Sequence, residues 1–198
     1  MFPGARQWAP NTVATRSASF PRARERARPP YEAIVAVCAV LALPLWLVEI
    51  HSAFGLPAHP LILHVPVVFV PLLGLAALAV AVRPAALMDR FGTALGGFAV
   101  VTMAATLLTA GAGEAFAEER SGPSPALLRE HAEAGKDLRL FVVGLTAVLV
   151  LWMLGCGRGA TAKVVARVLT AVLALGAIFF VIRAGHLGAE LAWSHGPR

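Results

Sequence analysis

Five long apolar stretches constrain this chain more than any other feature of its sequence. A helix needs roughly 17–25 residues to cross the hydrocarbon core of a bilayer, and each stretch is of that order. No stretch carries an acidic or basic residue in its middle. Since only a helix satisfies its own backbone hydrogen bonds in lipid, we predict five transmembrane helices. Their ranges are 33–50, 61–82, 91–112, 138–154 and 164–182.

The composition also indicates a bilayer as the solvent. Of the 198 residues, 58% are hydrophobic and 14% are charged, whereas soluble proteins carry about 25% charged residues. The formal net charge of +6 would suit nucleic acid, but the basic residues lie in short segments between the apolar stretches. There they act as topology signals, so we expect no nucleic-acid partner. Cys38 and Cys156 have no CxxC neighbour and are expected to pack as small apolar residues.

The basic residues predict the orientation in the membrane. Eleven of the seventeen fall in the N-terminal arm and in the connections around residues 83–90 and 158–167, which must share one side. That side holds three acidic residues and the opposite side holds eight. Because lysine and arginine concentrate in cytoplasmic segments, we predict a cytoplasmic N-terminus and a C-terminus outside. Helical spans of this kind are typical of a bacterial inner (plasma) membrane rather than an outer one.

The fold class predicted is an all-α integral membrane helical bundle with three parts. Residues 1–30 are rich in Arg and Pro and are expected to form a disordered cytoplasmic arm. Residues 31–56 are expected to form an extra N-terminal transmembrane helix, retained as an uncleaved anchor. Residues 57–198 are expected to form a four-helix membrane domain. This domain is the core, and it carries most of the histidines.

All six histidines are predicted to lie on the outer side of the membrane, which fits either a shared site or ordinary interface residues. His64 is the most informative, because it lies one turn inside an apolar stretch, where polar groups face the bundle interior. Pro66 and Pro71 should bend this span and free backbone carbonyls for other partners. His51, His59 and His195 are expected to be interface residues.

Three further residues complete the candidate site. A helix starting near Ser124 should run unbroken into the fourth span, and in it His131 shares a face with Gly135 and points towards the bundle. Glu114 is the carboxylate nearest the membrane after the third span. His186 follows the fifth span and could also point inwards. His64, His131 and His186 therefore form the working set, with Glu114 beside them.

Taken together, these segments resemble a bacterial membrane family known as domain of unknown function 2231. The resemblance covers roughly residues 57–196, leaving the first span and the arm outside. It implies a four-helix membrane core and no established activity. The motifs that carry it are His59-Pro60 with His64, Gly113-Glu114 with Glu118-Glu119-Arg120, Glu130-His131-Ala132 with Gly135, and Gly185-His186 with Gly188-Ala189 and Trp193.

Three functions remain open. The first is a structural or partner-binding membrane subunit without a cofactor, in contact with lipids and with a second copy or another membrane protein. Its sequence support is Gly92-x-x-x-Gly96 in the third span, a helix-packing pattern. The second is a haem b or redox protein, with His64 and His186 as axial ligands and His131 in reserve. The third is a divalent-metal site formed by His64, Glu114, His131 and His186.

Transport and enzymatic catalysis fit less well. No span has a charge at mid-membrane, and no inverted repeat is visible in the hydropathy. The sequence also offers no nucleophile with a matching base. We therefore expect a membrane protein that is not an enzyme.

Overall fold

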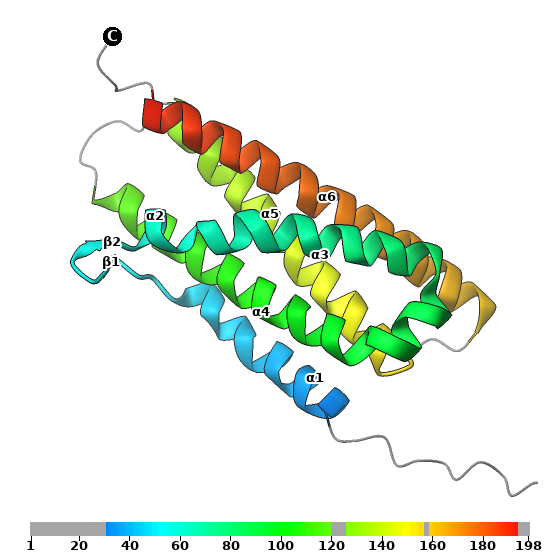
Figure 1. Cartoon of the computed structure of the whole chain (residues 1–198). Coiled ribbons are helices and arrows are strands. Elements are labelled where there is room, and N and C mark those ends of the chain that lie inside the picture. Colours follow the sequence, from blue (N-terminus) through cyan, green and yellow to red (C-terminus); the bar gives the residue numbers. More distant parts are fainter. Residues whose placement is uncertain (1–30, 120–125, 157–158, 194–198) are drawn as a thin grey trace, which may run out of the picture.

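A computed structural model describes residues 31–119, 126–156 and 159–193. The predicted arm, residues 1–30, and His195 lie outside the described residues. Within them the chain forms an all-α bundle, which confirms the predicted fold class (Figure 1). Its main helices are α1 (Tyr31–Ala42), α3 (His64–Val82), α4 (Pro84–Glu118), α5 (Ala126–Met153) and α6 (Ala160–Trp193).

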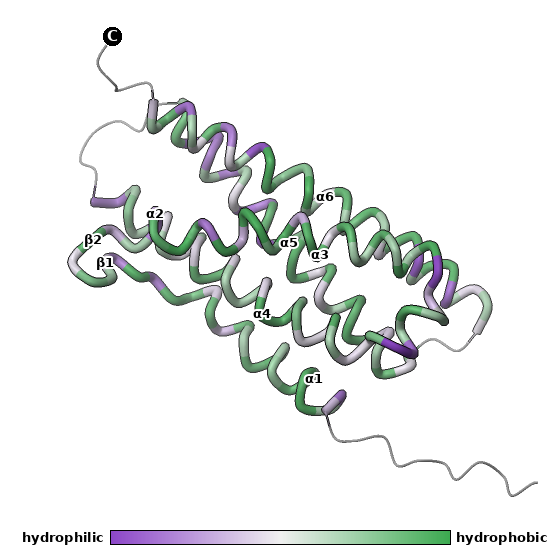
Figure 2. Tube along the Cα trace, viewed as in Figure 1, coloured by the Kyte–Doolittle hydropathy of each residue, from purple (hydrophilic) through white to green (hydrophobic). Residues whose placement is uncertain are grey.

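These helices run side by side in alternating directions, so the bundle has two distinct ends (Figure 1). One end holds the start of α1, the turn between α3 and α4, and the start of α6; we call it the arginine end. The other holds a short hairpin, α2 (Ala58–Ile62), and the last turns of α4 and α6; we call it the histidine end. Hydrophilic segments gather towards both ends, and the middle is mainly hydrophobic (Figure 2).

Three described helical segments are long and apolar enough to cross a membrane, judged by length and composition: Ala58–Val82, Ala86–Glu118 and Ala160–Trp193. The first predicted span is a shorter apolar segment, Tyr31–Leu47. Helix α5 is continuous from Ala126 to Met153, as expected, but its first half carries Lys136, Asp137 and Arg139. The five predicted spans thus correspond to helices of unequal apolar length.

The first span and the segment after it differ from the prediction. Instead of one helix over 33–50, α1 ends at Ala42 and a 3-10 helix, η1, covers Leu43–Leu47. Pro44 explains the change, because it has no N–H for an α-helical bond and its ring clashes with the preceding turn. An unpredicted hairpin follows, in which β1 (Ser52–Ala53) pairs with β2 (Leu56–Pro57). Phe54 and Gly55 form its turn with φ of 54° and 76°, as a tight hairpin turn requires.

The proline-rich start of the second span does free a carbonyl, as predicted. Helix α2 gives way to α3 at Leu63. Pro66 lacks the N–H that would bond the carbonyl of Ile62 four residues earlier. That carbonyl lies 3.4 Å from the Thr109 hydroxyl of α4, whose single hydrogen has a closer acceptor in the Ala105 carbonyl of its own helix, at 2.8 Å. The distortion therefore leaves the Ile62 carbonyl beside α4.

The core is packed through small residues as well as large ones. One buried cluster includes Met103, Leu107, Val142 and Val181, and a second includes Leu73, Leu145 and Leu149. The Gly92-x-x-x-Gly96 pattern is used within the chain. A Cβ added at Gly96 would lie 2.8 Å from the sulfur of Met153 in α5 and 3.2 Å from Val35 in α1. These glycines bring α1 and α5 close to α4, as small residues do between membrane helices.

Candidate functional site

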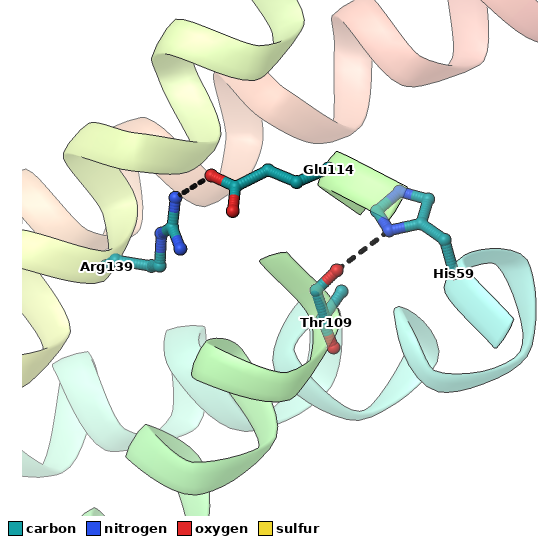
Figure 3. Close-up of polar contacts among 4 residues, drawn as sticks. All are labelled: His59, Thr109, Glu114 and Arg139. Carbon is teal, nitrogen blue, oxygen red and sulfur yellow. Dashed lines mark hydrogen bonds and ion pairs between the residues drawn. The ribbon is translucent and has the colours of Figure 1, made fainter. Parts of the chain in front are cut away.

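Five polar residues meet inside the bundle near its histidine end, and we call them the polar layer. They are His59 from α2, Thr109 and Glu114 from α4, and His131 and Arg139 from α5. Figure 3 shows four of them: the His59 ring faces the Thr109 carbonyl, and the Glu114 side chain extends towards Arg139. Every contact in the layer joins two different helices.

His59 links α2 to α4. Its ring is partly buried, and Nδ1 donates to the backbone carbonyl of Thr109 at 2.9 Å. Gly113 allows this approach, since a Cβ there would lie 2.9 Å from the same nitrogen. The ring also stacks on Phe116, with 6.5 Å between centroids. His59 is thus held by a backbone acceptor, a glycine and an aromatic ring of one helix.

His131 makes the corresponding link between α5 and α6. Its partly buried ring donates from Nδ1 to the Ala184 carbonyl at 2.9 Å. A Cβ at Gly188 would lie 3.1 Å from its Cε1 atom. The predicted inward orientation of His131 is confirmed. The ring lies edge-on to His59, with 6.1 Å between centroids.

The two bonds fix the chemistry of both rings. A carbonyl only accepts, so Nδ1 carries the hydrogen in each ring, and in the neutral imidazole Nε2 is then an acceptor. Histidines that bind metals often have this arrangement, with one nitrogen held by a backbone carbonyl. The same arrangement also serves two residues whose only task is to join helices.

Arg139 and Glu114 form an ion pair between α5 and α4. The Arg139 side chain is only 3% exposed, and Nη2 donates to Glu114 Oε1. The guanidinium carbon lies 4.8 Å from the centre of the Trp46 ring in η1, a cation–π contact. Nε and Nη1 of Arg139 are buried without a hydrogen-bond partner among the described residues. The aromatic face and the carboxylate offset part of the cost of burying this charge, and the two nitrogens that have no partner among the described residues add to that cost.

Two of the predicted site residues lie elsewhere. His64 and His186 are exposed on the bundle surface, so their predicted inward orientation is wrong. His64 Nδ1 lies 3.4 Å from the carbonyl oxygen of Leu61, three residues earlier in the chain. His51, expected at the interface, is exposed and bonds Glu119 at 2.8 Å. His59, also expected at the interface, instead faces the interior, as His131 does.

The structure therefore does not assemble the metal site predicted from His64, Glu114, His131 and His186. Glu114 is engaged with Arg139, and two of the histidines point outwards. Across residues 31–119, 126–156 and 159–193, no group of three or more His, Cys, Asp or Glu side chains is placed to hold a metal ion. Zinc sites use three or four protein ligands. The proposed haem ligands His64 and His186 likewise do not face a common space within the core.

Residues 55–198 match the family described as "Predicted membrane protein (DUF2231)". The chain belongs to this family. The resemblance noted in the sequence is thereby confirmed. Neither the curated proteins nor the solved structures contain a match.

The match begins at residue 55, after η1. The five residues of the polar layer therefore lie within the family domain, and the α1–η1 segment that packs beside them does not. Trp46, which contacts Arg139, comes from the preceding segment. At Gly111 of α4, an added Cβ would collide with the Val48 carbonyl oxygen. The N-terminal segment is therefore packed closely against the family domain.

Three residues of the polar layer were not predicted from the sequence: Arg139 and Thr109 were not candidates, and His59 was expected at the interface. Arg139 lies three and seven residues before Val142 and Thr146, which are buried on the same stripe of α5. This spacing was a usable signal that Arg139 faces inwards. His59 gave no such signal. It lies in a short helix among several prolines, so the direction of its side chain could not be predicted from helical spacing.

Proposed function

We propose that this chain is a structural, partner-binding subunit of a bacterial inner membrane, in which the inward histidines and arginine join helices instead of holding a cofactor. The observation that carries the proposal is that the hydrogen bonds of these inward side chains join one helix to another. His59 connects α2 to α4, His131 connects α5 to α6, and Arg139 connects α5 to α4. Interhelical hydrogen bonds of this kind stabilise membrane helix bundles.

We further propose five membrane crossings, with the N-terminus in the cytoplasm and the C-terminus outside. Helix α4 ends at the histidine end and α6 begins at the arginine end (Figure 1). Helix α5 must return between them, and its one buried charge, Arg139, is paired inside the bundle. The α1–η1 segment lies along α4 and is about 28 Å long at 1.5 Å and 2.0 Å per residue, close to the roughly 30 Å thickness of the hydrocarbon core.

The decisive experiment is purification of the full chain from membranes after haem- and metal-supplemented expression. We expect no Soret band and no stoichiometric metal in the purified protein. We also expect the solubilised chain to migrate with a partner or a second copy in light-scattering chromatography. A Soret band, or bound metal that disappears in His131→Ala, would overturn the cofactor-free reading.

Matched histidine variants separate a linking role from a binding role. If the layer only joins helices, His59→Ala and His131→Ala should lower thermal stability, and His64→Ala and His186→Ala should not. A cofactor held by the predicted ligands gives the opposite pattern, because loss of His64 or His186 would then change the bound spectrum or metal content. A monomer in every mild detergent and in native membranes would argue against a partner-binding subunit.

A further inference from the structure

An open groove lies between the last turns of α3 and the first turns of α6, at the arginine end of the bundle. It has a volume of about 460 Å³ and is lined by Leu78, Val82, Val164, Val168 and Ala171, with Arg167 beside them. Ligand clefts typically measure about 300–1,000 Å³, so this one is large enough for part of a lipid chain. Its walls are almost entirely aliphatic.

Arg167 is held in place by the end of the neighbouring helix. Its Nε donates to the Ala81 carbonyl at 2.7 Å, and Nη2 lies 3.4 Å from the Val82 carbonyl. These carbonyls belong to the last turn of α3, whose acceptors have no partner within their own helix. Pro84 starts the next helix and has no N–H to offer. An arginine from α6 therefore caps α3.

The cap leaves much of the guanidinium available. The group has five N–H donors in a planar fork, and the two bonds to α3 use two of them. Arg167 as a whole is exposed. A planar fork that is already fixed in position can bind a phosphate with little further loss of freedom.

We propose that this groove binds one anionic phospholipid, with the headgroup phosphate on Arg167 and an acyl chain along the aliphatic walls. Leu78 and Ala171 each lie one turn deeper than Val82 and Arg167, so the apolar walls continue towards the bilayer centre below the charge. Basic pockets between membrane helices on the cytoplasmic side suit such headgroups. The surrounding charges favour an anion: Arg83, Arg90 and Lys163 are exposed at this end, against the exposed acid Asp89.

The test is native mass spectrometry of the full chain, titrated with phosphatidylglycerol or with phosphatidylcholine of the same acyl chains. Phosphatidylglycerol should bind at one site more tightly than phosphatidylcholine. Arg167→Gln should weaken it about fivefold or more, since one basic side chain near an anionic headgroup contributes about that factor. Val168→Trp should weaken binding as well, by filling the groove while keeping the charge.

Arg90→Gln is the matched control. It removes one charge from the same end but from a residue that does not line the groove, so it should weaken binding much less than Arg167→Gln does. Equal affinity for the two lipids, or unchanged binding in Val168→Trp, overturns the proposal. Competition by inorganic phosphate would indicate an ion site instead, and loss of a dimer in Val168→Trp would assign the groove to a second copy. If Arg167→Gln fails to fold because α3 loses its cap, Val168→Trp decides.

Discussion

At the scale of single residues, a histidine's neighbours distinguish its role better than its position in the sequence. His59 and His64 are five residues apart, which on one ideal helix corresponds to a difference of about 140° in direction. They cannot both face the same interior. In this chain His59 has a backbone acceptor and a glycine beneath it, whereas His64 is exposed. The same contrast separates His131 from His186.

His59→Ala should therefore lower the stability of the bundle. The variant loses the bond to Thr109 and leaves a void over Gly113, at a cost of about 1–2 kcal/mol. His64→Ala, at an exposed position, should change stability by less than about 0.5 kcal/mol. Thermal unfolding of both variants in the same detergent measures the difference. Equal midpoints would contradict the linking role of His59.

The ion pair predicts a non-additive result. Glu114→Gln leaves Arg139 buried with a weakened partner, and breaking a buried pair costs about 3–5 kcal/mol, less here because Glu114 is 36% exposed. The double variant Glu114→Gln/Arg139→Met removes the buried charge and should recover much of that loss. Chemical unfolding of the wild type, both single variants and the double variant gives the coupling. Additive effects would mean that the pair contributes little.

At the scale of elements, the sequence predicted helices well and their local distortions poorly. Apolar length was enough to place α3, α4 and α6, because lipid leaves the backbone no alternative to helix. The 3-10 turn at Leu43–Leu47 follows from Pro44, whose effect the prediction did not include. The contact of Val48 with Gly111, which precedes the hairpin at Ser52–Pro57, is a tertiary contact that the sequence does not show. The sequence also did not predict which face of α2 points inwards, because that orientation depends on the break between α2 and α3 at Leu63.

The contact between Gly111 and Val48 can be tested with two glycines of one helix. Gly111→Ala would place a methyl group on the Val48 carbonyl, and such overpacking costs about 1–3 kcal/mol. Gly97 has no atom within 4 Å of an added Cβ. Gly97→Ala should be neutral or stabilising by up to about 1 kcal/mol, because alanine favours helix over glycine. Thermal unfolding should rank Gly111→Ala lowest, with faster proteolysis before residue 58; equal midpoints would refute the contact.

At the scale of the whole molecule, the two ends of the bundle differ in charge as the two faces of a membrane do. Eight of the eleven acidic residues lie towards the histidine end: Glu49, Glu114, Glu118, Glu119, Glu130, Glu133, Asp137 and Glu190. The arginine end carries Arg83, Arg90, Lys163 and Arg167. Charge segregation of this kind sets the orientation when helices insert. Because five helices in alternating directions connect the two ends, this charge difference predicts on which side of the membrane each connection lies.

Reporter fusions test the orientation and the crossings of α4, α5 and α6. Alkaline phosphatase is active only outside the cytoplasm, and green fluorescent protein fluoresces only inside it. We expect phosphatase activity for fusions after Gly122 and Arg198, and fluorescence for fusions after Arg83 and Arg158, because the connections alternate between the two sides. The pair at Gly122 and Arg158 is decisive for α5: if this helix did not cross, both fusions would report the same side. Reversed readings at all four sites would preserve the crossings of α4, α5 and α6 and invert the orientation, and the lipid in the groove beside Arg167 would then belong to the outer leaflet.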